Sequence, residues 1–229
     1  MQLYHQFFDP HSRFVRLVLA EYDIEVKLID EPVWRRRPEF LTLNPACTVP
    51  VLIAENAFPV PGAGVIAEYI DETLAKDKGG ERLLPTESDA RVEVRRLAAW
   101  FNIKFFAEVS ELLVREKVWK RYMRPDEGGG PPDSSAIRAA RANIGEHLRY
   151  LGWLAKTRKW LAGDRLTYAD LAAAAHISTC DYLGEVPWAE EENAKNWYAR
   201  VKSRPAFRVF LTETIPGLPP SASYTNLDF

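Results

Sequence analysis

The spacing of apolar residues changes once along this chain, and that change divides the chain into two parts. Up to residue 76, short apolar runs alternate with amphipathic stretches, a pattern typical of strands and helices in turn. From residue 88 onward, apolar residues recur every three or four positions, which is typical of helices alone. The sequence therefore predicts an α/β domain followed by an all-α domain.

The first part predicts the order strand, helix, strand, short helix, strand, strand, helix. Two of the strands are separated only by the polar pair Glu55-Asn56, which favours a hairpin. This order fits a small mixed sheet with helices. The predicted strands lie at 1–7, 25–30, 49–54 and 57–60, and the predicted longer helices lie at 12–22 and from residue 64 to about 76.

The second part predicts helices, followed by a segment without apolar periodicity. Residues 77–87 are polar and predict a linker, and 213–229 contains three prolines, which predicts an extended tail. The last residues, Leu227, Asp228 and Phe229, are an unusual place for exposed apolar groups. The predicted helices span 88–123, 133–157, 168–182, 191–203 and 206–212.

Composition excludes several classes of protein. The net charge of −2 and pI of about 6.1 favour neither nucleic acid nor an anionic membrane, and no apolar run approaches the roughly 18 residues of a membrane span. Cys47 and Cys180 lie far apart and the four histidines are scattered, so we expect no disulfide framework and no metal site. The amino-terminal residues lack the pattern of a signal peptide, and we expect a cytoplasmic protein.

Four segments resemble the glutathione transferase superfamily, in the same order and at similar distances. The resemblance covers roughly residues 1–212, and it implies a thioredoxin-like domain at 1–76 and a helical domain at 88–212. In the family, the proline that corresponds to Pro50 is cis, and Thr167 with Asp170 forms a capping box. The four segments read HSRFVRLVLAE from residue 11, FLTLNPACTVPVL from 40, LTYADLAAA from 166 and WYARVKSRPAF from 197.

The resemblance directs attention to the end of the first strand, where these enzymes use Ser, Cys or Tyr to stabilise the thiolate of glutathione. This residue precedes the arginine of the first helix by seven positions, so it corresponds to Asp9 if that arginine is Arg16. A carboxylate there would raise the pKa of the thiol and oppose the chemistry. Ser12 or Tyr4 could supply a substitute hydroxyl, although Ser12 is also typical of a helix start.

The helix from residue 64 begins without any side-chain oxygen. In the family, a Glu-Ser pair at this place binds the γ-glutamyl end of glutathione, and the pair corresponds here to Gly62 and Ala63. Losing both side chains should cost about 2–5 kcal/mol of binding. Val49 and Pro50 could still meet a peptide backbone. We interpret the glutathione site as degenerate, with no catalytic residue and no cofactor.

Two basic and aromatic stretches could bind a partner instead. Trp34 beside Arg35, Arg36 and Arg37 has the composition of a binding hot spot, although the tryptophan could pack on the sheet while the arginines are solvated. The second stretch ends the helix predicted at 88–123, where basic residues also complement the helix dipole. Its members are Lys117, Trp119, Arg121 and Arg124.

The blank helix start, the basic loop and the tail resemble a branch of the superfamily that acts in alphaproteobacterial cell division. That resemblance implies a homodimer without enzymatic activity that binds and bundles filaments of the tubulin homologue FtsZ, is recruited to the division site and helps to regulate constriction. The tail would contact a second division protein. The alternatives are a divergent glutathione-dependent transferase or peroxidase using Ser12, Tyr4 or Cys47, and a protein that binds another small molecule between its domains.

Overall fold

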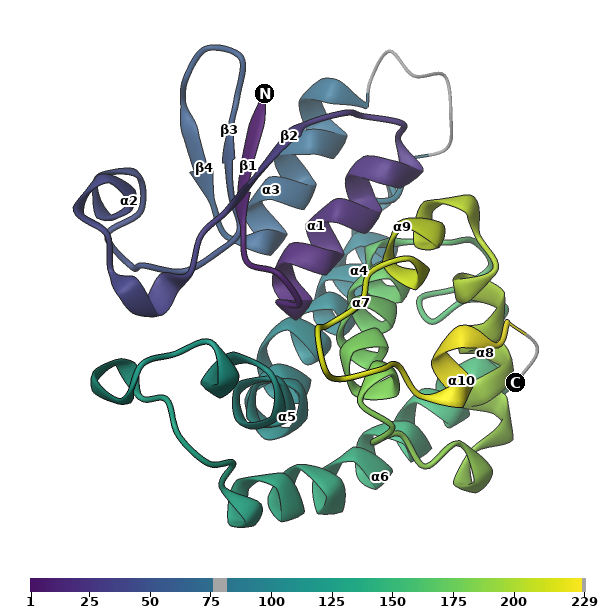
Figure 1. The fold of residues 1–229 in the computed structure, drawn as a ribbon. Helices are drawn as coiled ribbons and strands as arrows, with labels where there is room; N and C mark the ends of the chain where they lie inside the picture. Colours follow the sequence, from purple (N-terminus) through teal and green to yellow (C-terminus); the bar gives the residue numbers. More distant parts are fainter. Residues whose placement is uncertain (76–81, 228–229) are drawn as a thin grey trace.

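The computed structural model describes residues 1–75 and 82–227, and the first domain is built on a mixed sheet with strand order β2-β1-β3-β4 (Figure 1). The strands are β1 (Gln2–His5), β2 (Lys27–Asp30), β3 (Val51–Ile53) and β4 (Pro59–Pro61). β1 pairs with β2 in parallel because a helix connects them, and the β3–β4 hairpin is antiparallel. The predicted order of strands is confirmed.

Helices cover both faces of this sheet (Figure 1). α1 (Pro10–Glu21) and α3 (Ala63–Tyr69) lie together on the face toward the second domain, and α3 continues as a π-helical turn, η2 (Ile70–Leu74). On the other face lies α2 (Pro38–Leu43), preceded by the 3-10 turn η1 (Val33–Arg35).

The second domain is helical, as predicted. Its long first helix is wound in three parts: α4 (Ser88–Ala99), the π-helical η3 (Trp100–Ser110) and α5 (Glu111–Lys117). The prediction that this helix reaches residue 123 is wrong, because the backbone at Val118 (φ −117°, ψ −66°) leaves the α-helical path. The following elements are η4 (Trp119–Arg121), η5 (Pro125–Glu127), α6 (Ser134–Thr157), α7 (Tyr168–Tyr182), η6 (Trp188–Glu190), α8 (Glu192–Lys202), η7 (Pro205–Phe207), α9 (Arg208–Leu211) and α10 (Ala222–Thr225).

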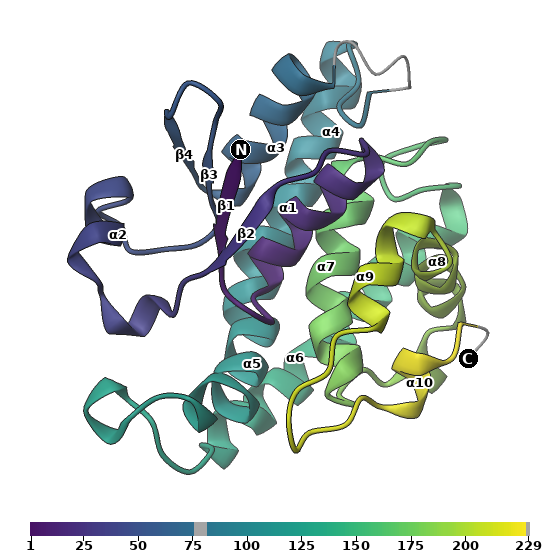
Figure 2. The ribbon, with the colours of Figure 1, turned by 45° about the horizontal axis from the view of Figure 1, so that its top comes forward.

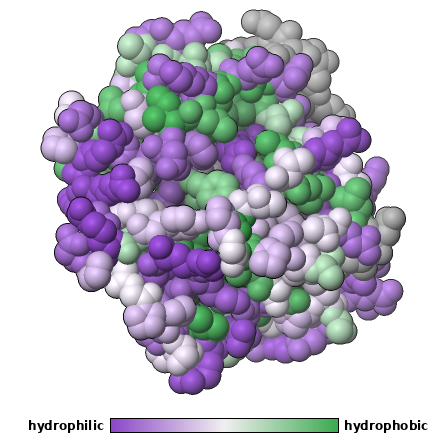
Figure 3. Space-filling view, in the orientation of Figure 1, coloured by the Kyte–Doolittle hydropathy of each residue, from purple (hydrophilic) through white to green (hydrophobic). Residues whose placement is uncertain are grey.

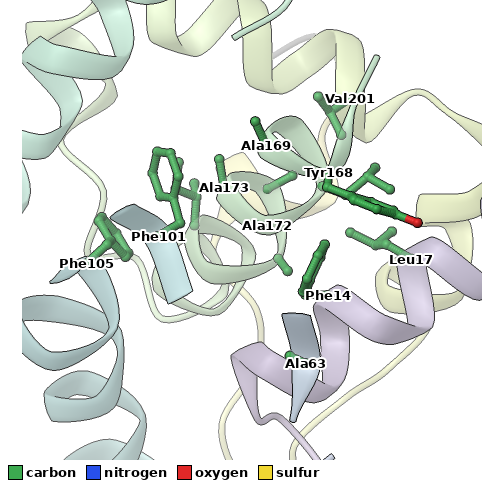
Figure 4. Packing of buried hydrophobic residues seen from close by; sticks show 14 of the residues in the cluster. Phe14, Leu17, Ala63, Phe101, Phe105, Tyr168, Ala169, Ala172, Ala173 and Val201 are labelled. Atoms are coloured by element: carbon green, nitrogen blue, oxygen red, sulfur yellow. The ribbon is translucent and has the colours of Figure 1, made fainter. Parts of the chain in front are cut away.

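α7 is the centre of the molecule, and every one of its side chains is buried. Phe14 and Leu17 of α1 point toward Tyr168 and the small alanines of α7, so the two domains share one core (Figure 4). The hydroxyl of Tyr168 also donates to the carbonyl of Ala67 in the first domain at 2.6 Å. The domain interface is therefore packed and hydrogen-bonded.

The start of α7 is a complete capping box, which confirms the prediction for Thr167 and Asp170. The carboxylate of Asp170 accepts from the backbone N–H of Thr167 at 3.0 Å, from the N–H of Leu161 at 2.9 Å and from the indole of Trp197 at 2.9 Å. One buried carboxylate thus joins three segments of the helical domain.

The carboxy-terminal segment is docked on its own chain rather than free (Figure 2). Tyr182 of α7 holds it at two points, since its hydroxyl accepts from the N–H of Ile215 and donates to the carbonyl of Leu218, both at 2.8 Å. The amine of Lys202 donates to the carbonyls of Ser223 and Asn226, at 2.6 Å each. Part of the predicted linker (residues 77–81), and Asp228 and Phe229 of the tail, lie outside the described residues.

Within residues 1–75 and 82–227, no helix combines the length and apolar character needed to cross a bilayer.

Candidate functional site

A cavity of about 650 Å³ opens between the two domains. It lies where the loop before α2 faces the turn after α5 (Figure 1), and hydrophilic side chains surround the loop (Figure 3). We call this cavity the interdomain cleft. The residues used below from its walls are Gln6, Phe7, Trp34, Arg35, Trp119, Tyr122, Thr214 and Pro216.

The first wall includes the predicted Trp34, but the three arginines that follow it in the sequence do not share one role. Trp34 is half-buried and packs against the core, with one edge in the cleft. Arg37 is engaged, because its guanidinium forms an ion pair with the buried Glu31 that raises the pKa of the arginine. Arg35 and Arg36 are exposed, and neither is in an ion pair with any described residue. The three arginines are adjacent in the sequence, yet the structure ties Arg37 to Glu31 and leaves Arg35 and Arg36 exposed.

The second wall comes from the turn after α5, where Trp119 and Tyr122 reach the cleft. The prediction that these cations lie along one continuous helix is wrong, because α5 ends at Lys117. Lys117 pairs with Glu185, and Arg124 pairs with Glu127 at 3.1 Å.

Arg121 is engaged as well, since it donates to the carbonyls of Pro216 and Gly217 at 3.4 Å. Trp119 and Tyr122 of this stretch therefore line the cleft, whereas Lys117, Arg121 and Arg124 are engaged in contacts within the chain.

The carboxy-terminal segment provides the third wall, which the sequence did not predict. Thr214 and Pro216 line the cleft, and Glu213 anchors them to α1 by ion pairs with Arg16 at 2.5 Å and Arg13 at 3.3 Å. Gln6 was also missed. Its position directly after β1 was a usable signal, because ligands bind at the carboxyl ends of parallel strands.

The positions near the expected thiolate site serve the fold. Asp9 is the N-cap of α1, and its carboxylate accepts from the N–H of Ser12 at 2.6 Å, so the helix begins at Pro10 rather than at residue 12. Burial raises the pKa of Asp9. Ser12 is fully buried and its hydroxyl accepts from the N–H of Gln6 at 3.3 Å. This serine is closed to solvent.

The other candidate groups also have structural neighbours. Tyr4 stacks obliquely on Phe40, with ring centroids 5.7 Å apart. The thiol of Cys47 is buried and lies 3.4 Å from the carbonyl of Val33. Neither side chain belongs to the lining of the interdomain cleft.

The start of α3 has no side-chain cap, as its sequence indicates. Gly62 has φ +93°, a conformation that favours glycine, and its N–H donates to the carbonyl of Pro50 at 3.0 Å. The Val49–Pro50 peptide bond is cis. Ala63 lies in a separate, smaller groove of about 300 Å³ between α3 and α4, which is mostly apolar.

The described residues contain no group of three or more His, Cys, Asp or Glu side chains arranged to hold a metal ion.

Comparison with known proteins agrees with this architecture. Residues 10–73 match the model of the glutathione S-transferase N-terminal domain, and residues 114–205 match that of the C-terminal domain. FtsZ-localized protein A of Caulobacter vibrioides (strain NA1000 / CB15N) is 42% identical over 99% of this chain and 97% of its own. The chain belongs to the glutathione S-transferase superfamily.

Two solved structures from this superfamily are similar over their whole length. A glutathione S-transferase from Sinorhizobium meliloti 1021 is 49% identical with a TM-score of 0.95, and covers 100% of this chain and 99% of its own. FzlA from C. crescentus is 42% identical with a TM-score of 0.89, at the same coverage.

Proposed function

We propose that this protein is a homodimer that binds and bundles FtsZ filaments at the division site and does not act on glutathione. One observation carries the proposal: aromatic and cationic side chains line the interdomain cleft, whereas no polar side chain lies at the start of α3. The cleft gathers Trp34, Arg35 and Trp119, whereas the start of α3 has only Gly62 and Ala63. The similarity to FtsZ-localized protein A supports FtsZ as the partner.

A second copy of the chain would cover an apolar face on α3, α4 and η3. Val65, Val92 and Ile103 are each at least 60% exposed. The elements that carry them are adjacent, because Arg95 of α4 pairs with Glu68 of α3 at 2.7 Å. Exposed apolar side chains grouped in this way favour an interface. A two-fold dimer built on this face would carry two clefts, and two binding sites on one particle can link two filaments.

The first test is Trp34→Glu in co-sedimentation with FtsZ polymerised by GTP, with GDP as the unpolymerised control. We expect filament affinity to fall at least tenfold, because truncating an aromatic hot-spot residue commonly costs about 2 kcal/mol or more. Val209→Glu is the control for adding a negative charge elsewhere on the surface, since Val209 is an exposed apolar residue of α9 that does not line the cleft. Equal binding by both variants would exclude the cleft as the filament site.

The second test separates filament binding from bundling. Ile103→Glu places a charge in the proposed dimer face, and we expect a monomer by light scattering. This variant should still pellet with single filaments at high speed but should not form bundles that pellet at low speed. Bundling by a monomeric variant would contradict the dimer model.

The S. meliloti relative favours an alternative, a divergent glutathione-dependent transferase. Calorimetric titration with glutathione distinguishes the two. We expect no binding at millimolar ligand, and tight binding together with conjugating activity that is lost in Tyr4→Phe would support the alternative.

A further inference from the structure

The turn after β2 holds a cationic residue in a backbone conformation that favours glycine. Arg36 ends η1 with φ +45° and ψ +48°, in the left-handed region. Side chains other than that of glycine crowd the main chain in this region, so glycine or asparagine is usual there. Arg36 follows Arg35 and precedes Arg37, and both of these neighbours line the interdomain cleft. A long side chain therefore lies at the rim of the cleft, where glycine would fit with less strain.

Two other residues with left-handed backbone gain contacts from their side chains. The ring of Phe8 (φ +67°) is buried and lies edge to face on Tyr182, with ring centroids 4.9 Å apart. The thiol of Cys47 (φ +54°) is buried and lies 3.4 Å from the carbonyl of Val33. These contacts offset the strain of the backbone.

Arg36 has no such contact. Its side chain is exposed and forms no hydrogen bond, ion pair or ring contact with any described residue. Ala57 (φ +61°) is also exposed, but it carries only a methyl group and does not line the cleft. Backbone strain that persists without a structural reason is typical of residues that contact a ligand or partner.

The charges around Arg36 indicate what it can bind. Arg35 is exposed as well and is in no ion pair with the part of the chain that the structure describes, whereas Arg37 is paired with the buried Glu31. Two guanidinium groups thus lack a counter-charge in a protein whose net charge is −2. A guanidinium pairs with a carboxylate through two parallel hydrogen bonds, so this rim fits acidic side chains.

The wall next to these arginines is aromatic. Trp34 is half-buried and Tyr122 is 45% exposed, and both line the cleft. The carboxylate of Asp30 in the same wall accepts from the N–H of Phe7 at 3.1 Å and is in no ion pair with either free arginine. A protein segment that places an apolar side chain against the rings and carboxylates at the rim would match both features.

We propose that Arg36, together with Arg35, binds acidic side chains of the FtsZ filament, while an apolar side chain of the same segment enters the interdomain cleft against Trp34 and Tyr122. This inference rests on the proposed function and adds the chemical class of the bound segment. It assigns Arg37 to the fold, because its guanidinium is paired with Glu31.

The test is a series of substitutions at Arg36 in co-sedimentation with GTP-polymerised FtsZ. Asparagine and aspartate both accept left-handed backbone, so Arg36→Asn removes the charge and Arg36→Asp reverses it without adding strain. At low salt, we expect affinity to fall about two- to fivefold for Arg36→Asn, the worth of one exposed ion pair, and further for Arg36→Asp. Arg36→Lys should retain most of the affinity, and all these differences should shrink at high salt.

A stability measurement distinguishes recognition from a structural role. Arg36→Gly relieves the strained backbone, so it should unfold at or above the wild-type urea midpoint while binding filaments as weakly as Arg36→Asn. Ala57→Gly is the matched control, because it makes the same backbone change outside the cleft and should leave filament binding unchanged. Arg37→Asn should instead lower the midpoint, since it leaves the buried Glu31 without its partner.

The outcomes separate this inference from the proposed function. Full binding by Arg36→Asn and Arg36→Asp at low salt would overturn the role of Arg36 and leave the filament-binding proposal standing. A fall in the urea midpoint of Arg36→Gly that matches its loss of binding would also overturn that role. Failure of the wild-type protein to pellet with filaments would overturn both.

Discussion

The start of α7 carries a polar side chain that accepts several hydrogen bonds, and the start of α3 carries none. At α7, Asp170 collects donors from Thr167, Leu161 and Trp197. At α3, Gly62 offers no side chain, and its own N–H is used by the carbonyl of Pro50. Both helices lie against the shared core, yet only one retains polar side chains at its start.

The difference separates residues that maintain the fold from residues that hold a ligand. Asp170 cannot be removed without leaving several buried donors unpaired, so its role survives any change of ligand. The start of α3 is stable without a cap because its helix is held by buried Ile66 and Ala67. Because α3 does not depend on a capping side chain, substitutions at its start can change ligand binding without destabilising the helix.

The largest expected effect is that of Asp170→Ala. Removal of this carboxylate should lower the free energy of unfolding by about 3–5 kcal/mol, because it leaves buried N–H groups without acceptors. Urea unfolding followed by tryptophan fluorescence measures this. A loss below about 1 kcal/mol would mean that the network is not a structural requirement.

Asp9→Ala should have a smaller effect of about 1–2 kcal/mol, since it removes the N-cap of α1. Asp9→Ser is the matched variant, because serine is also a good N-cap and additionally restores the residue type expected of an active family member. We expect Asp9→Ser to unfold close to the wild-type urea midpoint without gaining glutathione conjugation. Activity in this variant would show that Asp9 alone blocks catalysis.

Ala63→Ser should change stability least, by less than about 1 kcal/mol, since α3 does not depend on a cap. Glutathione affinity, measured by calorimetry, should remain weaker than millimolar because Gly62 still lacks the carboxylate. Submillimolar binding would contradict this expectation, because it would mean that the single added hydroxyl is enough to restore glutathione binding at the start of α3.

The sequence predicted well those features that depend on neighbours along the chain. The order of strands and helices, the capping box at Thr167 and the uncapped start of α3 follow from periodicity and local chemistry. The start of α1 was misplaced because Ser12 resembles a cap, whereas Asp9 followed by Pro10 is the actual start.

The features that were missed depend on residues far apart in the chain. Lys117 and its acidic partner Glu185 are separated by 68 positions, and Arg121 binds main-chain carbonyls that carry no sequence signal. The cleft itself needs three segments at once, and Gln6 has no local pattern that marks it as unpaired. Spacing alone cannot supply such information.

Arg13 of α1 sets an order on the synthesis of the protein. Its guanidinium is fully buried and donates to Ser178 at 2.8 Å and to Tyr224 at 3.3 Å, the second being 211 residues later in the chain. Until Tyr224 has left the exit tunnel of the ribosome, this cation lacks that partner. The first domain can therefore reach its final packing only after the segment around Tyr224 has emerged.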